Sequence, residues 1–221
     1  MTYVRLTVDE CIKVGIDSIF IVVIISTFIG AVMAIQTAYN LVSPLVPLYI
    51  ISVIVRDSVL LELAPTITAI VFAGKVGSNI AGELGTMRIT EQIDAIEVMG
   101  INSASFLALP KILACVLMYP LLVILAGYLG ILGGYLAATF TGQMSPDQYI
   151  YGIRYGFIEF NVTFALIKSF VFAFLISSIS AFTGYYTSGG ALEVGKASTK
   201  AVTTSCIAIL SADYLLAQLL L

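Results

Sequence analysis

The sequence has no histidine and no tryptophan, and only 10% of its 221 residues are charged. Histidine is the side chain that most often transfers protons near neutral pH and most often binds transition metals. A soluble domain carries about a quarter of charged residues, whereas 60% of this chain is hydrophobic. These values indicate an integral membrane protein, and we expect neither a catalytic residue nor a metal site in it.

Cysteine and clustered positive charge are also scarce. The three cysteines, Cys11, Cys115 and Cys206, lie far apart and form no CxxC pair, so we expect buried thiols and no redox or metal motif. The net charge is -3 and no basic run is present. Nucleic acid is therefore not an expected partner.

Five apolar runs are long enough to cross a bilayer, which requires about 20 helical residues. We expect these spans at about residues 18–39, 48–76, 106–140, 162–185 and 197–221. A short proline-containing turn is expected between Asn40 and Pro47. The prediction is an all-α, polytopic membrane protein whose residues 1–221 form a single domain.

Lysine and arginine are distributed unevenly between the two sides of the predicted membrane domain. One side receives Arg5, Lys13, Lys75, Arg88, Lys111, Lys196 and Lys200. The other side receives Arg154 and, near a helix end, Arg56. Because cytoplasmic loops carry the excess of positive charge, we expect the N-terminus and residues 77–105 in the cytoplasm and the C-terminus outside.

The external connection at residues 143–161 is expected to contain a short helix. Ser145 can cap its first turn, and Pro146 suits the first helical position, where a missing N–H is harmless. Aromatic residues follow at Tyr149, Tyr151, Tyr155, Phe157 and Phe160. They favour an anchor in the headgroup layer, and a docking surface for an external partner is the alternative.

The longest polar segment, Glu83 to Gly100, predicts a cytoplasmic amphipathic helix at about residues 86–100. Its apolar residues recur at helical spacing, at Ile89, Ile93, Ile96 and Met99. Its polar face comprises Arg88, Glu91, Gln92, Asp94 and Glu97. Thr90 is expected to cap the helix and Gly100 to end it. The periodicity fits either a simple connector or a helix that couples this chain to a motor.

Four glycines precede this helix, at Gly74, Gly77, Gly82 and Gly85. We expect them to form a glycine-rich turn and to allow close packing. The pair Gly74–Lys75 does not complete a phosphate-binding loop, which needs a glycine five residues earlier, where the chain has Ala69, and a serine or threonine in place of Val76. We therefore expect no ATP binding by this chain; if ATP drives the protein, the ATPase is another polypeptide.

Three charged residues are expected inside the membrane, where a charge near the centre costs at least ~2.5–3.5 kcal/mol. They are Glu62, Lys168 and Asp213. Counted from the cytoplasmic ends of their spans at ~1.5 Å per residue, they lie at similar depths of ~20–24 Å. They form either a structural ion cluster or a polar pocket for a lipid headgroup, in which Lys168 would bind phosphate.

A GxxxG motif at Gly130 and Gly134 lies in the third predicted span. Glycines at this spacing let helices approach closely. The contact is expected within the chain, with a dimer contact as the alternative.

The sequence ELAPTITAIVFAGKVGSNIAG, from Glu62 to Gly82, continues as ELGTMRITEQIDAIEVMG, from Glu83 to Gly100. Together they resemble the hallmark of MlaE-family permeases, and weaker similarity covers LIKSFVFAF around Lys168 and the closing ILSADYLLAQLLL. Some members carry an arginine before the glutamate of the second span, where this chain has Leu61.

The resemblance implies the membrane subunit of an ABC transporter for phospholipids or related lipids. It implies a homodimer bound to two ATPase subunits, which would hold the ATP and Mg, so no cofactor is expected in this chain. An MCE-protein hexamer on the periplasmic face and a possible STAS-domain partner are further expected partners. In the family, the segment matching Thr86 to Gly100 is the coupling helix, and the three intramembrane charges match residues implicated in the lipid path.

The main hypothesis is therefore a non-catalytic permease subunit of the inner membrane that moves lipids between inner and outer membranes. The alternative is an ion-coupled secondary transporter with Glu62 and Asp213 as proton carriers, which the absence of a repeated half disfavours. A membrane scaffold without transport is the third possibility.

Overall fold

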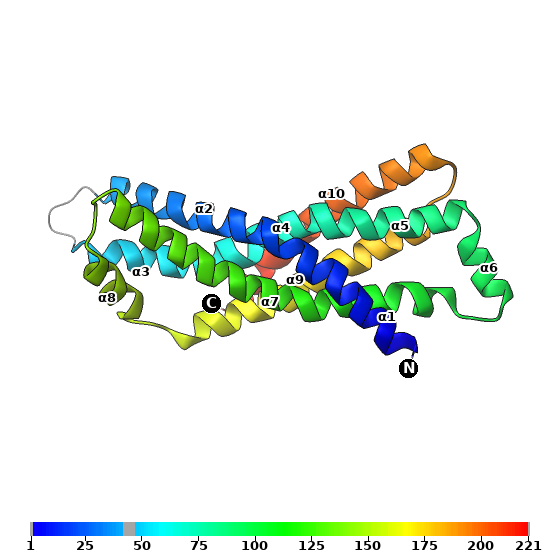
Figure 1. Cartoon of the computed structure of the whole chain (residues 1–221), viewed down its shortest axis with the longest axis horizontal. Coiled ribbons are helices and arrows are strands. Elements are labelled where there is room, and N and C mark those ends of the chain that lie inside the picture. Colours follow the sequence, from blue (N-terminus) through cyan, green and yellow to red (C-terminus); the bar gives the residue numbers. More distant parts are fainter. Residues whose placement is uncertain (1, 42–46, 221) are drawn as a thin grey trace. The chain divides into compact units, whose positions relative to one another are not determined.

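The computed structural model describes residues 2–41 and 47–220, and these residues are almost entirely helical, with no strand among them (Figure 1). Five helical segments are long and apolar enough to cross a membrane: Tyr3–Asn40, Tyr49–Ile89, Ser103–Phe140, Glu159–Tyr185 and Ala191–Leu220. The predicted all-α class with five spans is therefore confirmed. The turn expected between Asn40 and Pro47 lies mostly outside the described residues.

The first two long segments contain α1 (Thr2–Cys11), α2 (Asp17–Asn40), α3 (Tyr49–Ser58), α4 (Thr68–Phe72) and α5 (Ser78–Ile89). The remaining elements are α6 (Gln92–Val98), α7 (Ser103–Phe140), α8 (Pro146–Arg154), α9 (Glu159–Tyr185) and α10 (Ala191–Leu220). A helix of 38 residues such as α7 is ~57 Å long at ~1.5 Å per residue, which exceeds the ~30 Å hydrocarbon core. The longest segments are therefore long enough to extend beyond the hydrocarbon core of the bilayer.

Three π-helical segments, Ile12–Ile16, Val59–Ile67 and Ala73–Gly77, join the α-helices of the first two long segments. Pro65 lies within the second of them. Because proline has no N–H and its ring displaces the carbonyl of the preceding turn, it prevents regular α-helical hydrogen bonding there. The second long segment therefore contains two π-helical stretches without ending, and Pro65 accounts for the first of them.

The structure differs from the prediction at the end of the second span. The chain was expected to leave the membrane helix near Val76 and to form a glycine-rich turn, but it stays helical to Ile89. Gly74 and Gly77 lie in a π-helical segment, and Gly82 and Gly85 lie in α5. The glycines are therefore helical residues and do not form a turn.

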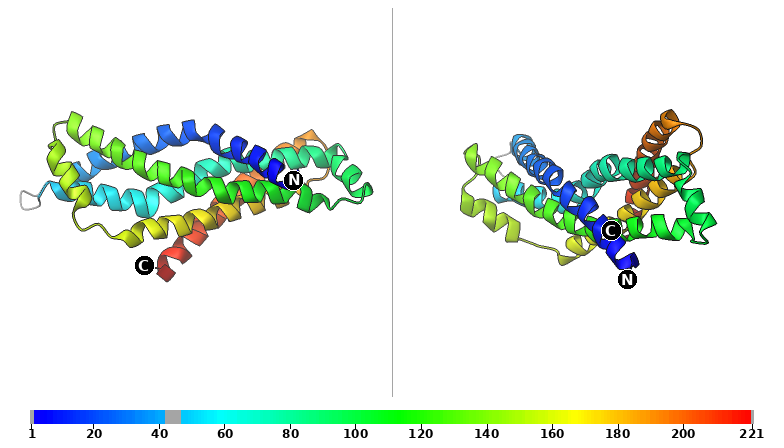
Figure 2. Two further views of the ribbon diagram at one scale, coloured as in Figure 1. Left: turned by 60° about the horizontal axis from the view of Figure 1, so that its bottom comes forward. Right: turned by 45° about the vertical axis from the view of Figure 1, so that its right-hand side comes forward.

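The chain forms two compact units, and the first comprises Met1–Ser18, Ala69–Leu121 and Lys168–Leu221. In this unit α5 runs alongside α10 (Figure 2). Glycines of the second long segment face small side chains of α9 and α10: Gly77 faces Ser180, and Gly82 faces Ser198. These small surfaces explain why the glycines remain helical, because helix packing compensates for their low helix propensity.

The second unit comprises Ile19–Thr68 and Leu122–Ile167. Here α2 and α7 meet at backbone distance, because a Cβ atom at Gly30 would overlap the backbone of Gly130. A Cβ atom at Gly133 would likewise overlap the backbone of Thr27, and Gly134 packs against Val55 of α3. The glycines of the third span thus pack within the chain.

The external segment of the second unit is ordered around α8, which lies beside α3 (Figure 1). The Ser145 side chain accepts a hydrogen bond from the backbone N–H of Gln148, and the Gln148 side chain accepts one from the N–H of Ser145. This reciprocal cap, followed by Pro146, confirms the predicted helix start.

Candidate functional site

A buried ion pair joins α9 to α10 in the first unit. Lys168 is 1% exposed, and its Nζ lies 2.5 Å from Oδ1 of Asp213. An unpaired charge in this apolar setting would be strongly unfavourable, and a partner within contact distance offsets much of that cost. The structure therefore brings together two of the three charges that the sequence placed inside the membrane.

The third charge, Glu62, lies in the second unit, within the π-helical segment that contains Pro65. Its side chain is exposed on the surface of the single chain. π-Helical turns occur frequently at functional sites because they re-aim the side chains around them. That Glu62 shares one pocket with Lys168 and Asp213 stays a prediction.

The predicted amphipathic helix is divided in two by a sharp bend. α5 ends at Ile89, Glu91 adopts the left-handed conformation with φ of 59°, and α6 begins at Gln92. Thr90 does not cap α6, because its hydroxyl donates to the carbonyl oxygen of Thr86 in the preceding turn, at 2.8 Å. Arg88 spans the bend with a 2.7 Å ion pair to Asp94.

Two faces of α6 differ sharply in exposure. Ile93 is fully buried and Ile96 is half-buried, as the periodicity predicted. Val98 is 89% exposed and Met99 is 67% exposed, at the end of the helix. Gly100 follows with φ of 78°, a conformation that suits glycine and ends the helix where the sequence predicted. The polar residues Glu91, Gln92 and Asp94 are exposed.

Glu97 is the polar residue of α6 that turns toward the rest of the first unit. Its Oε1 accepts hydrogen bonds from the Ser103 hydroxyl, at 2.6 Å, and from the Tyr185 hydroxyl, at 3.0 Å. These hydrogen bonds, with a smaller contribution from Arg88, lower the pKa of the Glu97 carboxyl below its ordinary value. The carboxylate is therefore charged at neutral pH and joins α6 to α7 and α9.

A second buried lysine, Lys111, connects three segments of the first unit. Its Nζ lies 2.7 Å from Oε2 of Glu83 on α5 and 3.2 Å from Oε1 of Glu10 on α1, and Lys111 is buried. Glu10 also pairs with Lys13 at 3.1 Å. Sequence reasoning used Lys111 only for membrane orientation. The available signal was a lysine next to Pro110, inside an otherwise apolar run.

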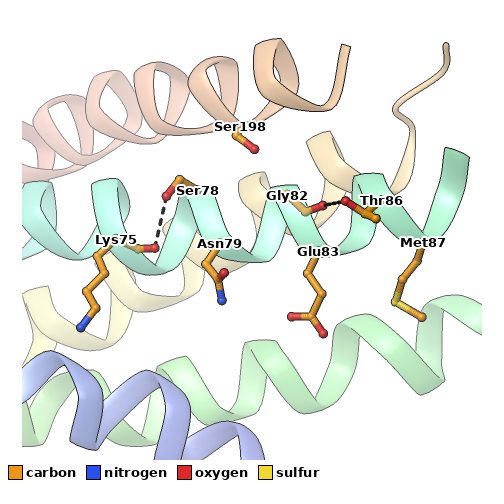
Figure 3. Close-up of a pocket in the computed structure, with 8 residues that line it drawn as sticks. All are labelled: Lys75, Ser78, Asn79, Gly82, Glu83, Thr86, Met87 and Ser198. Atoms are coloured by element: carbon orange, nitrogen blue, oxygen red, sulfur yellow. Dashed lines mark hydrogen bonds between the residues drawn. The ribbon is translucent and has the colours of Figure 1, made fainter. Parts of the chain in front are cut away.

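An open cavity of about 700 Å³ lies between α5 and α10 in the first unit (Figure 3). It is lined by Lys75, Ser78, Asn79, Gly82, Glu83, Thr86, Met87 and Ser198. A neighbouring cavity of about 310 Å³ shares Lys75 and Asn79. The Lys75 amine donates to the backbone carbonyl oxygen of Asp17. Charged and polar side chains therefore line both cavities.

Within residues 2–41 and 47–220, no three His, Cys, Asp or Glu side chains are grouped so that they could hold a metal ion. Cys115 is buried, and the other two cysteines are half-buried free thiols.

Comparison with known proteins identifies relatives that match nearly the whole chain. A family model described as Permease MlaE matches residues 7–219. A probable ABC transporter permease protein of Rickettsia bellii is 36% identical over 217 residues, which cover 98% of this chain and 83% of that protein. A probable ABC transporter permease protein of Synechocystis is 35% identical over 216 residues, which cover 98% of this chain and 82% of that protein. Protein TRIGALACTOSYLDIACYLGLYCEROL 1, chloroplastic, of Arabidopsis thaliana is 32% identical over 214 residues, which cover 97% of this chain and 61% of that protein.

Proposed function

The chain belongs to the MlaE permease family, and from this membership we propose that it moves phospholipids or related lipids between the inner and outer membranes. The family and the five apolar helices make it the multi-pass membrane subunit of an ABC transporter, whose ATPase activity resides in a partner. The name of the Arabidopsis relative contains that of a glycerolipid, which supports a lipid as the substrate class.

The observation that carries the lipid proposal is the ion pair between Lys168 and Asp213. A buried lysine within an apolar span is rare, because a charge inside the membrane is costly. Such charges mark substrate or ion paths. A lipid phosphate can replace Asp213 as the partner of the Lys168 ammonium, so the site exchanges one ion pair for another. Glu62, on the exposed surface of the second long segment, is proposed as a further polar group of this path.

The coupling proposal rests on the exposed end of α6. Val98 and Met99 present an apolar tip at the end of α6, next to the exposed Glu97, and the exposed polar residues Glu91, Gln92 and Asp94 lie toward the start of the helix. Such a combination suits a protein interface, in which an apolar centre is surrounded by polar groups. We propose that this tip docks into the ATPase subunit and receives its movement.

The assembly that we propose is a homodimer with two ATPase subunits, which hold ATP and Mg, so that this chain has no catalytic role. An MCE-protein hexamer would lie on the periplasmic side, and a STAS-domain protein is a further possible partner. The chain would lie in the inner membrane with its N-terminus in the cytoplasm and its C-terminus in the periplasm. Asymmetric placement of lysine and arginine supports this orientation.

The test measures ATP-dependent transfer of acyl-labelled phosphatidylglycerol by the whole complex in proteoliposomes. We expect Lys168→Ala to lower transfer at least about tenfold, because a hydrogen bond to a charged group is lost. Lys196→Ala is the matched control, since Lys196 is an exposed lysine that pairs with Glu193 in the preceding turn. Wild-type transfer by Lys168→Ala would exclude the proposed role of this residue.

The same preparation distinguishes the ion-coupled alternative. ATP-driven transfer should continue when a protonophore removes the proton gradient and should stop when the ATPase subunit is omitted. The reverse result would favour proton coupling through Glu62 and Asp213 over the ABC mechanism.

A further inference from the structure

We propose that Tyr185 is a positioning residue that links movement of α6 to α9, and thereby to the Lys168–Asp213 ion pair. This inference rests on the proposed function, because it requires that α6 receives the movement of the ATPase. In this proposal, movement of the docking tip on α6 passes through the hydrogen bond between Glu97 and Tyr185 to α9 and the lipid path.

The contact is a triangle of three oxygen atoms from three separate elements. The hydroxyl oxygens of Ser103 and Tyr185 lie 2.7 Å apart, and both lie within hydrogen-bond distance of Oε1 of Glu97. Ser103 is buried at the start of α7, Glu97 lies near the end of α6, and Tyr185 is the last residue of α9. One carboxylate oxygen thus holds the ends of three helices together.

The number of hydrogens in this triangle favours an arrangement in which both hydroxyls donate to the carboxylate. Each hydroxyl carries one hydrogen and an ionised carboxylate carries none, so two hydrogens serve three oxygen–oxygen edges. When both hydroxyls donate to Glu97, each forms a charge-assisted bond, which is about twice as strong as a neutral one. Tyr185 is therefore held most firmly when Glu97 is ionised, the state favoured at neutral pH.

Two further contacts place Tyr185 beside the bend between α5 and α6. The guanidinium of Arg88 lies over its ring, 6.0 Å from the centroid, while the same side chain pairs with Asp94 on α6. The neighbouring Gly184 packs so closely on Ala81 of α5 that a Cβ there would meet backbone atoms. A displacement of the bend must therefore displace the end of α9 or break these contacts.

Beyond Tyr185, the path to the ion pair is one uninterrupted α-helix. α9 runs from Glu159 to Tyr185 as a single α-helix, and Lys168 lies 17 residues from Tyr185 in the sequence, which is ~26 Å at ~1.5 Å per residue. Helices with their hydrogen bonds intact move as rigid elements, which is how small shifts reach distant sites. Movement at Tyr185 would thus change the distance between Lys168 and Asp213 on α10.

The experiment compares Tyr185→Phe with Tyr186→Phe in the complete complex in proteoliposomes. Both variants remove one hydroxyl from adjacent tyrosines, but Tyr186 is exposed and its hydroxyl has no hydrogen bond in the described part of the chain. Two rates are measured, ATP hydrolysis and transfer of labelled phosphatidylglycerol, and their ratio is the lipid moved per ATP.

We expect Tyr185→Phe to hydrolyse ATP within about twofold of wild type and to move at least about fivefold less lipid per ATP, the lower end of coupling between sites. Tyr186→Phe should keep the wild-type ratio. An unchanged ratio in Tyr185→Phe overturns the inference. If the wild-type complex itself moves no lipid with ATP, the proposed function fails instead.

A second variant tests the inference at an exposed position, where substitution should not prevent folding. Glu97→Gln keeps the shape of the side chain and removes its charge, so it should lower lipid moved per ATP in the same direction as Tyr185→Phe. If both act through one contact, the double variant should be no worse than the more severe single variant. Full additivity of the two losses would contradict a shared contact.

Discussion

The two compact units of this chain share close glycine contacts between helix backbones, such as Gly184 on Ala81 in the first unit, and differ in the ion pairs that join separate helices. In the second unit, Gly30 and Gly130 bring α2 and α7 to backbone contact, and Arg56 bonds to backbone carbonyls. In the first unit, side-chain ion pairs such as Lys111–Glu83 and Lys168–Asp213 join separate helices. All lysines and arginines except Arg56 and Arg154 lie in the first unit.

This difference has a mechanical consequence. A contact between two backbones permits few alternative arrangements, since neither side can change rotamer, whereas an ion pair between flexible side chains can break and re-form with another partner. The first unit also holds α6 and the ion pair proposed for the lipid path. We therefore expect the conformational change of transport to be concentrated in the first unit, with the second unit as the more rigid part.

The largest expected effect concerns Arg56, which fixes the external segment of the second unit. It is 1% exposed, and its guanidinium donates to the carbonyl oxygens of Ile153, at 2.7 Å, and Tyr155, at 2.9 Å, while its Nε donates to Asp57, at 2.8 Å. Arg56→Met should lower the free energy of unfolding by about 3–5 kcal/mol, because Asp57 and two carbonyls lose their partner.

Thermal unfolding in detergent measures this loss through a thiol-reactive fluorogenic dye, since Cys115 is buried in the folded chain. Arg154→Met provides the control, because the Arg154 side chain has no hydrogen bond or ion pair in residues 2–41 and 47–220. Equal unfolding temperatures for the two variants would refute the proposal that Arg56 stabilises the external segment of this unit.

A smaller effect is expected from adding a methyl group where α2 meets α7. Gly30→Ala should cost up to about 3 kcal/mol of unfolding free energy, the upper part of the range for overpacking, because the new Cβ overlaps the backbone of Gly130. Gly74→Ala is the matched control in the first unit, where a Cβ meets no atom within 4 Å. Its effect should be neutral or slightly stabilising, since alanine favours a helix.

The same dye assay measures both glycine variants. A comparable loss of stability in Gly74→Ala would show that the loss in Gly30→Ala does not come from the close backbone contact. An unchanged Gly30→Ala would show that α2 and α7 can separate without cost.

The sequence predicted the parts of this structure that depend on local rules. Apolar run length located the five spans, and the Ser145–Pro146 pair located the start of α8. Helical periodicity placed Ile89, Ile93, Ile96 and Met99 on one face of the amphipathic segment, and Ile93 is buried as expected, whereas Met99 is exposed. Each of these signals is carried by neighbouring residues alone.

The features that the sequence did not predict depend on contacts between distant segments. Gly77 and Gly82 stay helical because Ser180 of α9 and Ser198 of α10 lie opposite them. Thr90 bonds backward to Thr86 because the chain bends at Glu91, and the role of Lys111 depends on carboxylates from two other helices. Pairing partners at such separations are not encoded by spacing along the chain.

The smallest expected effect is a pH dependence of stability that comes from Glu97 in the first unit. The folded-state pKa of Glu97 is lowered by the hydrogen bonds from Ser103 and Tyr185. Its contribution to stability is therefore fully present above the ordinary glutamate pKa and is lost as the pH falls through the lowered folded-state value.

Unfolding temperatures of wild type and Glu97→Gln, measured from about pH 8 to pH 3, isolate this contribution. The difference between the two proteins should be constant down to about pH 5 and should narrow only in the acid range, because protonated Glu97 resembles glutamine in charge. If the difference in unfolding temperature between wild type and Glu97→Gln disappears near neutral pH, the two hydroxyls do not stabilise the Glu97 carboxylate. The proposed contact between α6 and α9 would then not depend on the charge of Glu97.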